Sequence, residues 1–154
     1  MISRDYEEFL ESFNAHGVRY LVVGAHAVAF HARPRATKDL DLYLEPTREN
    51  AERALAAIRD FFGGSDLGLN PEDLIEPDSV IQLGIAPSRI DLLASLSAVQ
   101  DFQAAWDHRA EGHFGPIETQ YLALDDLLRE KEATGRDQDR VDARSLRKAR
   151  DLRT

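Results

Sequence analysis

The sequence contains no cysteine, which removes several kinds of chemistry at once. A chain without cysteine has no disulfide framework, no thiolate metal site and no cysteine nucleophile. For the same reason its composition does not indicate a reducing or an oxidising compartment. Any metal site must be built from histidine, carboxylate or other oxygen ligands.

Long apolar runs are also missing. None approaches the roughly 20 residues that a membrane-spanning helix needs. The first residues carry Asp5, Glu7, Glu8 and Glu11, whereas a signal peptide begins with basic residues. We therefore expect no membrane segment and a cytoplasmic location.

Positive charge is scarce, with 19 Lys and Arg against 28 Asp and Glu, and a net charge of −9 over 154 residues. Residues 1–128 hold 10 cations against 22 acids, whereas residues 129–154 hold 9 against 6. An acidic body disfavours general nucleic-acid binding, which requires a positive face. A bound cation with a local basic patch would still hold one phosphorylated substrate. Length and composition predict one globular domain.

The segment from Arg35 to Leu44 alternates Asp39, Asp41 and Tyr43 with leucines, a pattern typical of a half-buried strand. Because successive side chains of a strand point to opposite faces, Asp39 and Asp41 share one face. Two such carboxylates either bind a hard cation or lie solvated at a sheet edge, and both interpretations fit the pattern.

Three cations, Arg33, Arg35 and Lys38, precede this strand. They offset the acidic pair, and they are also candidates for binding phosphate.

A second candidate is the junction at Gly24. Residues 19–24 form a continuous apolar run, which predicts a strand buried on both faces, and residues 24–32 favour a helix. Such a junction directs backbone N–H groups and the positive end of the helix dipole at one point. Gly24 and Ala25 are therefore candidates for anion binding, although a tight turn without a ligand fits equally.

The rest of the chain predicts a layered α/β (α+β) fold. Asp91 lies on the second strand of a hairpin, where Arg89 and Leu93 share its face. The segments that we expect are helices at 5–16, 46–62 with Thr47 as N-cap, 97–110, 124–133 and 137–150, strands at 80–85 and 89–93, and a short strand near 116–118.

The histidines do not predict a zinc site. His26 and His31 are five residues apart and so lie on different faces of a helix, whereas a helical zinc pair needs a separation of four. We expect all five histidines to be surface or structural, with His26 an outside candidate for contacting a ligand.

Four ordered motifs together resemble a known superfamily. The segments Val22-Val-Gly-Ala-His-Ala-Val28, Pro34-Arg-Ala-Thr-Lys-Asp-Leu-Asp-Leu42 and Arg89-Ile-Asp-Leu-Leu93 resemble the polymerase-β-like nucleotidyltransferases. The segments Leu124-Asp-Asp-Leu-Leu-x-x-Lys131 and Gly135-Arg-x-x-Asp139-x-x-Asp142 resemble small bacterial proteins related to AbiEii-type toxin nucleotidyltransferases. The resemblance covers residues from about 18 to 146.

This resemblance implies a minimal nucleotidyltransferase fold, with a mixed sheet, flanking helices and C-terminal helices. It implies one nucleotidyltransferase-like domain over residues 1–154, with a core from about 18 to 95 and a helical part from about 97 to 154. One departure is Ala25, because the family's turn usually carries glycine or serine after the first glycine. The alanine still supplies a backbone N–H but no hydroxyl.

The resemblance also implies a chemistry, the transfer of a nucleoside monophosphate from a nucleoside triphosphate with two Mg²⁺ ions. Asp39 and Asp41 would bind both metals, and Asp91 would bind the catalytic metal and help to activate the acceptor.

In this scheme the triphosphate would be held by the turn residues Gly24 and Ala25 and by the cation Lys38. Lys131 matches a lysine that approaches the nucleotide phosphates, although an ordinary solvated helix lysine fits the same position. Arg136, Asp139 and Asp142 are expected to fix the C-terminal helices to each other.

Three functional hypotheses remain. The first is a Mg²⁺-dependent nucleotidyltransferase whose acceptor is tRNA or another RNA, a protein or a small molecule. The second is a catalytically silent nucleotide- or partner-binding module, such as half of a toxin–antitoxin pair. The third is a metal-dependent phosphodiesterase that directs the same carboxylates at water.

Overall fold

The computed structural model describes residues 2–34, 39–84 and 89–153. The strands are β1 (Tyr20–Val23), β2 (Leu40–Leu44), β3 (Val80–Leu83), β4 (Ile90–Leu93), β5 (Ala110–Phe114) and β6 (Ile117–Tyr121). The helices are α1 (Ile2–Ala15), α2 (Gly24–His31), α3 (Arg48–Phe61), the 3₁₀ helix η1 (Pro71–Leu74), α4 (Phe102–Asp107), α5 (Leu124–Thr134) and α6 (Asp137–Arg153). In these described ranges, no helix is long and apolar enough to cross a membrane.

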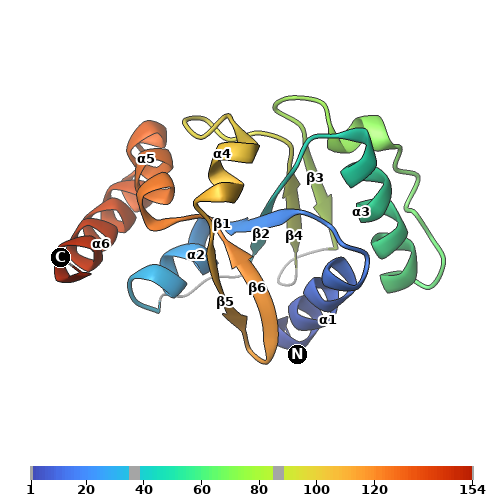
Figure 1. Cartoon of the computed structure of the whole chain (residues 1–154), viewed down its shortest axis with the longest axis horizontal. Coiled ribbons are helices and arrows are strands. Elements are labelled where there is room, and N and C mark those ends of the chain that lie inside the picture. Colours follow the sequence, from blue (N-terminus) through green and yellow to red (C-terminus); the bar gives the residue numbers. More distant parts are fainter. Residues whose placement is uncertain (1, 35–38, 85–88, 154) are drawn as a thin grey trace.

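The described strands form one mixed six-stranded sheet in the order β3-β4-β2-β1-β6-β5 (Figure 1). β2 runs parallel to β4 and antiparallel to β1, and β1 runs parallel to β6. The two outer pairs, β3 with β4 and β5 with β6, are antiparallel hairpins. The expected mixed sheet with flanking and C-terminal helices is confirmed.

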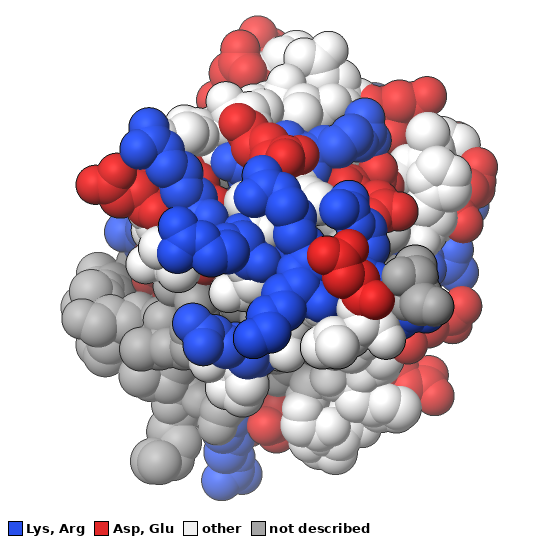
Figure 2. Space-filling view, turned by 90° about the vertical axis from the view of Figure 1, so that its left-hand side faces the viewer, with Lys and Arg blue, Asp and Glu red and all other residues white. Residues whose placement is uncertain are grey.

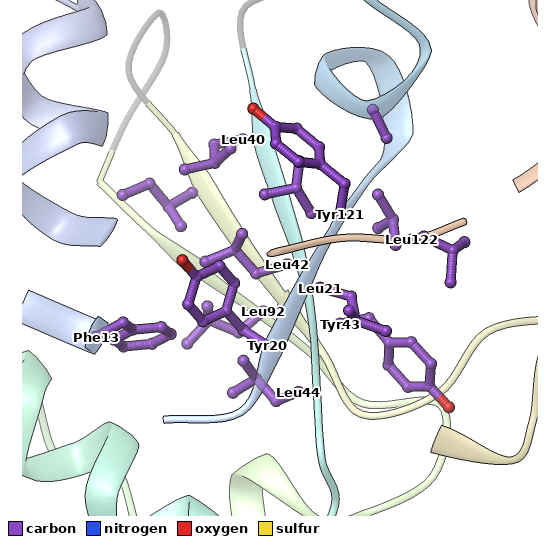
Figure 3. Close-up of a cluster of buried hydrophobic side chains, with 14 of the residues drawn as sticks. Phe13, Tyr20, Leu21, Leu40, Leu42, Tyr43, Leu44, Leu92, Tyr121 and Leu122 are labelled. Carbon is purple, nitrogen blue, oxygen red and sulfur yellow. The ribbon is translucent and has the colours of Figure 1, made fainter. Parts of the chain in front are cut away.

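Side-chain alternation along β1 and β2 divides the core between the two faces of the sheet. Tyr20 is paired with Leu44 and lies against Phe13 of α1, with ring centroids 5.9 Å apart. Tyr43, one residue before Leu44, points to the other face and meets Phe102 of α4 at 5.0 Å. Figure 3 shows Phe13 and Tyr20 to one side of β1 and Tyr43 to the other. Asp41 therefore belongs to the face that α4 covers.

The helices gather at two ends of the molecule. α1 and α3 lie together at the right of Figure 1, where Phe9 and Phe61 place their ring centroids 5.2 Å apart. α5 and α6 pack against each other at the left, next to α2. The N-cap prediction for α3 is confirmed, because the Thr47 side chain accepts a hydrogen bond from the Asn50 backbone N–H at 3.2 Å.

The helix expected over residues 97–110 is wrong at both ends. It begins only at Phe102, where the Asp101 side chain caps it, and it ends at Asp107. The backbone N–H groups of Ser97 and Ala98 instead donate to the carboxylate of Glu130, at 2.9 and 2.7 Å. A distant side chain thus binds these donors and fixes the segment before α4 against α5.

The segment that follows α4 also differs from expectation. The short strand expected near 116–118 is the longer β6, and residues 110–114, for which no strand was expected, form β5 and pair with it. Gly115, with φ at 59°, lies in the tight turn between the two strands.

Asn50 is fully buried and joins three chain segments through its amide group. Its Oδ1 accepts from the Arg19 backbone N–H at 2.8 Å, and its Nδ2 donates to the carbonyls of Arg19 and Glu45, both at 3.0 Å. The amide therefore joins the start of α3 to the segments that enter β1 and leave β2.

Replacing Asn50 tests this junction. Asn50→Ala should lower the free energy of unfolding by about 2–4 kcal/mol, because it leaves buried backbone groups without partners. The measurement is urea denaturation, with the neighbouring exposed substitution Glu49→Ala as control, expected within about 0.5 kcal/mol of wild type. A loss at Asn50→Ala no larger than the control's would contradict a structural role for this amide.

Candidate active site

The register of two parallel strands brings the predicted carboxylates together. Asp41 of β2 is directly opposite Asp91 of β4, and Asp39 lies two residues before Asp41 on the same face. All three line a cleft of about 520 Å³. Gly24 and Lys131 line the same cleft, whereas Ala25 is not among its described lining residues. Lys38 lies outside the residues that the structure describes.

Arg89 lies between two of these carboxylates. Its Nη2 donates to Asp39 Oδ2 at 2.8 Å, and its Nε donates to Asp91 Oδ1 at 2.9 Å. A second bond joins Nη2 to Asp91 Oδ2 at 3.3 Å, so the guanidinium holds Asp91 with two donors. Sequence analysis placed Arg89 on the face of Asp91 but gave it no function. The period of two along β4 was the signal that could have identified it.

Asp41 is the third carboxylate of the cleft, and the described contacts of Arg89 do not include it. Burial raises the pKa of Asp41 to about 7, and the negative charges of Asp91 and Asp39 act in the same direction. A hydrogen bond to Asp91 raises it further, since that bond requires a proton between the two carboxyl groups, while Lys131 lowers it. Asp39 and Asp91 therefore share one guanidinium, and Asp41 keeps a proton up to about pH 7.

Gly24 forms the wall beside Asp41. Its φ of 66° lies in the left-handed region, and a Cβ atom added there would collide with the Asp41 carboxylate, with Cγ at only 3.1 Å. Glycine therefore lets the backbone at the start of α2 approach the carboxylate closely. No side chain caps this helix start.

Lys131 is neither a solvated helix lysine nor a free cation. It is 8% exposed, and its Nζ lies 3.0 Å from Asp142 Oδ2 and 3.3 Å from Asp139 Oδ1. The solvated alternative is therefore wrong. The expectation that Asp139 and Asp142 connect the last two helices is confirmed, with Lys131 of α5 as their partner.

Arg136 completes this corner of the cleft. Its backbone N–H and its Nε donate to Asp139 Oδ2, at 3.1 and 3.0 Å. Although burial opposes the effect, these bonds, together with one from Thr134 and the charge of Lys131, hold the pKa of Asp139 well below its usual range. Arg136 itself stays exposed and lines the cleft.

Helix α1 contacts the segment that enters β4, next to the cleft, and sequence analysis missed this contact. The Tyr6 hydroxyl donates to the Arg89 carbonyl at 3.2 Å. Burial raises the pKa of Tyr6 to about 12, and the charges of Asp39, Asp41 and Asp91 add to the shift. Tyr6 also meets the His26 ring at 5.7 Å, so His26 packs among aromatic rings behind the carboxylates.

The donor set fits a hard divalent cation in its chemistry. Carboxylate oxygens are among the ligands that Mg²⁺ prefers, together with water and phosphate oxygens, and the cleft supplies three carboxyl groups. Their present arrangement is not a finished metal site, since the described residues hold no group of three acidic or histidine side chains positioned around one ion. Arg89 would have to release Asp39 and Asp91 for an ion to bind both.

The raised pKa of Asp41 predicts how stability depends on pH. The folded protein keeps a proton on Asp41 up to about pH 7, whereas the unfolded chain loses it near the ordinary aspartate pKa of 3.8. Between these values the folded state binds more protons, so the free energy of unfolding falls as the pH rises. A shift of this size corresponds to at most about 4 kcal/mol.

The substitution Asp41→Asn removes this titration. Its free energy of unfolding should equal that of wild type near pH 4 and exceed it by about 1–3 kcal/mol at pH 8, in urea denaturation without divalent cations. Asp78→Asn, at a cleft carboxylate outside the cluster, is the control and should change the slope little. Parallel stability curves for wild type and Asp41→Asn would show that Asp41 is ionised throughout.

Comparison with known proteins supports the fold assignment. No family model matches the chain, and no curated protein matches it. Among solved structures it is similar to an antigenic nucleotidyltransferase-like protein from Paracoccidioides brasiliensis, with a TM-score of 0.60 and 14% sequence identity. The match covers 98% of this chain and 76% of that chain. At this identity the similarity establishes the fold alone, and the chain has a nucleotidyltransferase-like fold.

Proposed function

We propose that the protein is a Mg²⁺-dependent nucleotidyltransferase that moves a nucleoside monophosphate from a nucleoside triphosphate to an acceptor hydroxyl. The observation that carries the proposal is the meeting of Asp39, Asp41 and Asp91 in one cleft of a nucleotidyltransferase-like fold. Asp39 and Asp41 would hold both ions, and Asp91 would hold the catalytic one. When bound, the ions would neutralise charge on the transferring phosphoryl group and the leaving group.

The chain's own residues have separate tasks in this proposal. Asp91 takes up the proton of the acceptor hydroxyl as the acceptor oxygen bonds to the α-phosphorus. The bond from that phosphorus to the bridging oxygen breaks, and pyrophosphate leaves. Gly24 lets the triphosphate approach the backbone at the start of α2, where N–H groups and the helix dipole attract anions. Lys131 and Arg136 add positive charge at the opposite wall.

A second candidate function is a catalytically silent nucleotide- or partner-binding module of the same fold. The ion pairs from Arg89 to Asp39 and Asp91 favour it, since a cation of the protein already occupies the position between these ligands. The relation to toxin–antitoxin pairs rests on the sequence resemblance alone.

Thermal unfolding tests the shared binding step. Mg²⁺ with a nucleoside triphosphate at about 100 times its Kd should stabilise wild type by about 2.7 kcal/mol and raise Tm by roughly 5–10 °C. Asp41→Asn should remain folded and show little of this shift, while the control Asp78→Asn should keep it. An equal shift in Asp41→Asn would remove Asp41 from the metal site.

Label transfer separates the two candidate functions. The protein is incubated with Mg²⁺, each α-labelled nucleoside triphosphate in turn and a cell extract, and both labelled product and pyrophosphate are measured. Asp91→Asn should bind Mg²⁺–nucleotide within a few fold of wild type and lose most of the transfer, since its base acts mainly in the transition state. Binding by wild type without transfer of any of the four nucleotides would favour the silent module. Release of monophosphate without a labelled acceptor would favour hydrolysis.

A further inference from the structure

A row of cations begins in the cleft and continues along α6. Arg136, directly before α6, and Arg140, Arg144 and Lys148 on α6 follow one another at intervals of four residues. Residues four apart lie on the same face of a helix, about 6 Å from each other along its axis. All four are exposed, and the first of them lines the cleft that holds the carboxylates. We call these four residues the α6 row.

A second hollow lies along the α6 row, and Lys131 borders both this hollow and the cleft. It measures about 530 Å³. Its lining residues are Lys131, Glu132, Gly135, Arg140, Ala143, Arg144 and Arg147. Four of these seven residues are cations. Lys131 and Arg147 are paired with acids, whereas Arg140 and Arg144 are less neutralised, so a polyanion in this hollow would contact these two arginines and lead towards the cleft. Figure 2 faces this side of the molecule and shows Lys and Arg gathered at its centre, with most Asp and Glu towards its margins.

Two cations of the α6 row carry charge that no described acid offsets. Arg144 and Lys148 form no ion pair with any residue that the structure describes, and Arg140 reaches only Asp137, at 3.7 Å. Arg136 is held by Asp139 at 3.0 Å, so the least neutralised part of the row is the part on α6. On α3, by contrast, Arg48, Arg53 and Arg59 each lie within 4.0 Å of a carboxylate.

We propose that the α6 row binds the phosphate backbone of a nucleic-acid strand and presents the end of that strand to the cleft as the acceptor. The inference rests on the proposed function, because it names the acceptor class of the same site. Arginine supplies three of the four cations, and its planar guanidinium matches phosphate oxygens with two donors. An anionic membrane surface fits less well, since a membrane-binding helix needs apolar side chains beside its cations. Val141 and Leu152 are the exposed large apolar residues among those described on α6.

Fluorescence anisotropy with labelled single strands tests the surface without requiring catalysis. Wild type should bind RNA or DNA strands of about 15 nucleotides, and log K should fall with log salt at a slope of about −2 to −3 for three or four phosphate contacts. The triple variant Arg140→Gln, Arg144→Gln, Lys148→Gln should weaken binding at least tenfold and reduce the slope by about 2. Comparing RNA with DNA shows which strand is preferred.

A matched triple on α3 controls for net charge. The triple variant Arg48→Gln, Arg53→Gln, Arg59→Gln also removes three positive charges, but from α3 at the other end of the molecule, as Figure 1 shows. Its affinity for the strand should stay within about twofold of wild type. Both triples should keep the Mg²⁺–nucleotide shift in Tm, which shows that they are folded and that the cleft is intact. Equal losses in the two triples would overturn the proposal, since net charge alone would then explain binding.

Further outcomes separate this inference from the proposed function. Label transfer to the strand by wild type that is lost in the α6 triple supports both. Strand binding through the α6 row without transfer of any nucleotide to the strand overturns the acceptor role, and transfer to a different acceptor does so while leaving the nucleotidyltransferase proposal intact. The nucleic-acid assignment would be overturned if wild type bound anionic vesicles through these residues but bound neither RNA nor DNA strands at 50 mM salt.

Discussion

The cleft requires three carboxyl groups, those of Asp39, Asp41 and Asp91, to lie close together, and the packing of the sheet holds them there. Asp41 and Asp91 face each other because β2 and β4 run parallel in a register fixed by their buried leucines and isoleucine. Shifting either strand by one residue would turn its leucines to the wrong face, so the hydrophobic core determines the position of the carboxylates. Burial raises the pKa of Asp41, and the repulsion from Asp91 and Asp39 raises it further. Apolar burial thus sustains an arrangement that electrostatics alone would disperse.

Two cations near this cleft act in different ways. Arg89 is a neighbour of Asp91 on the same strand and binds two carboxylates directly, so any ion that uses both must first displace it. Lys131 comes from the other end of the chain and is held by two acids of its own. Its charge still lowers the pKa of Asp41, although its ammonium group is already paired. Arg89 therefore competes with a bound ion for the carboxylates, whereas Lys131 stays in place and lowers the pKa of Asp41.

Local patterns predicted much of this arrangement from the sequence. Alternation placed Asp39 and Asp41 on one face, and the strand–glycine–helix junction located Gly24. Local patterns could not predict that Asp41 and Asp91 face each other, since nothing near either residue specifies which strands become neighbours. The helix expected over 97–110 is limited to Phe102–Asp107, and the contact of Ser97 and Ala98 with Glu130, more than thirty residues away, leaves no trace in the local pattern. Strand β5 was missed because Ala-Glu-Gly-His-Phe contains no β-branched residue.

The ion pairs of Lys131 also limit how far the protein can be shortened. A chain cut after α5 would retain the buried ammonium group and lose Asp139 and Asp142, its two counter-ions from α6. An uncompensated charge at this depth typically destabilises a protein by about 3–5 kcal/mol, enough to unfold the wall of the cleft that α5 forms. A trimmed version intended to retain only the sheet and the carboxylates would therefore need an apolar residue in place of Lys131. The last helix is in this sense a structural part of the cleft, although it lies outside the sheet that carries the aspartates.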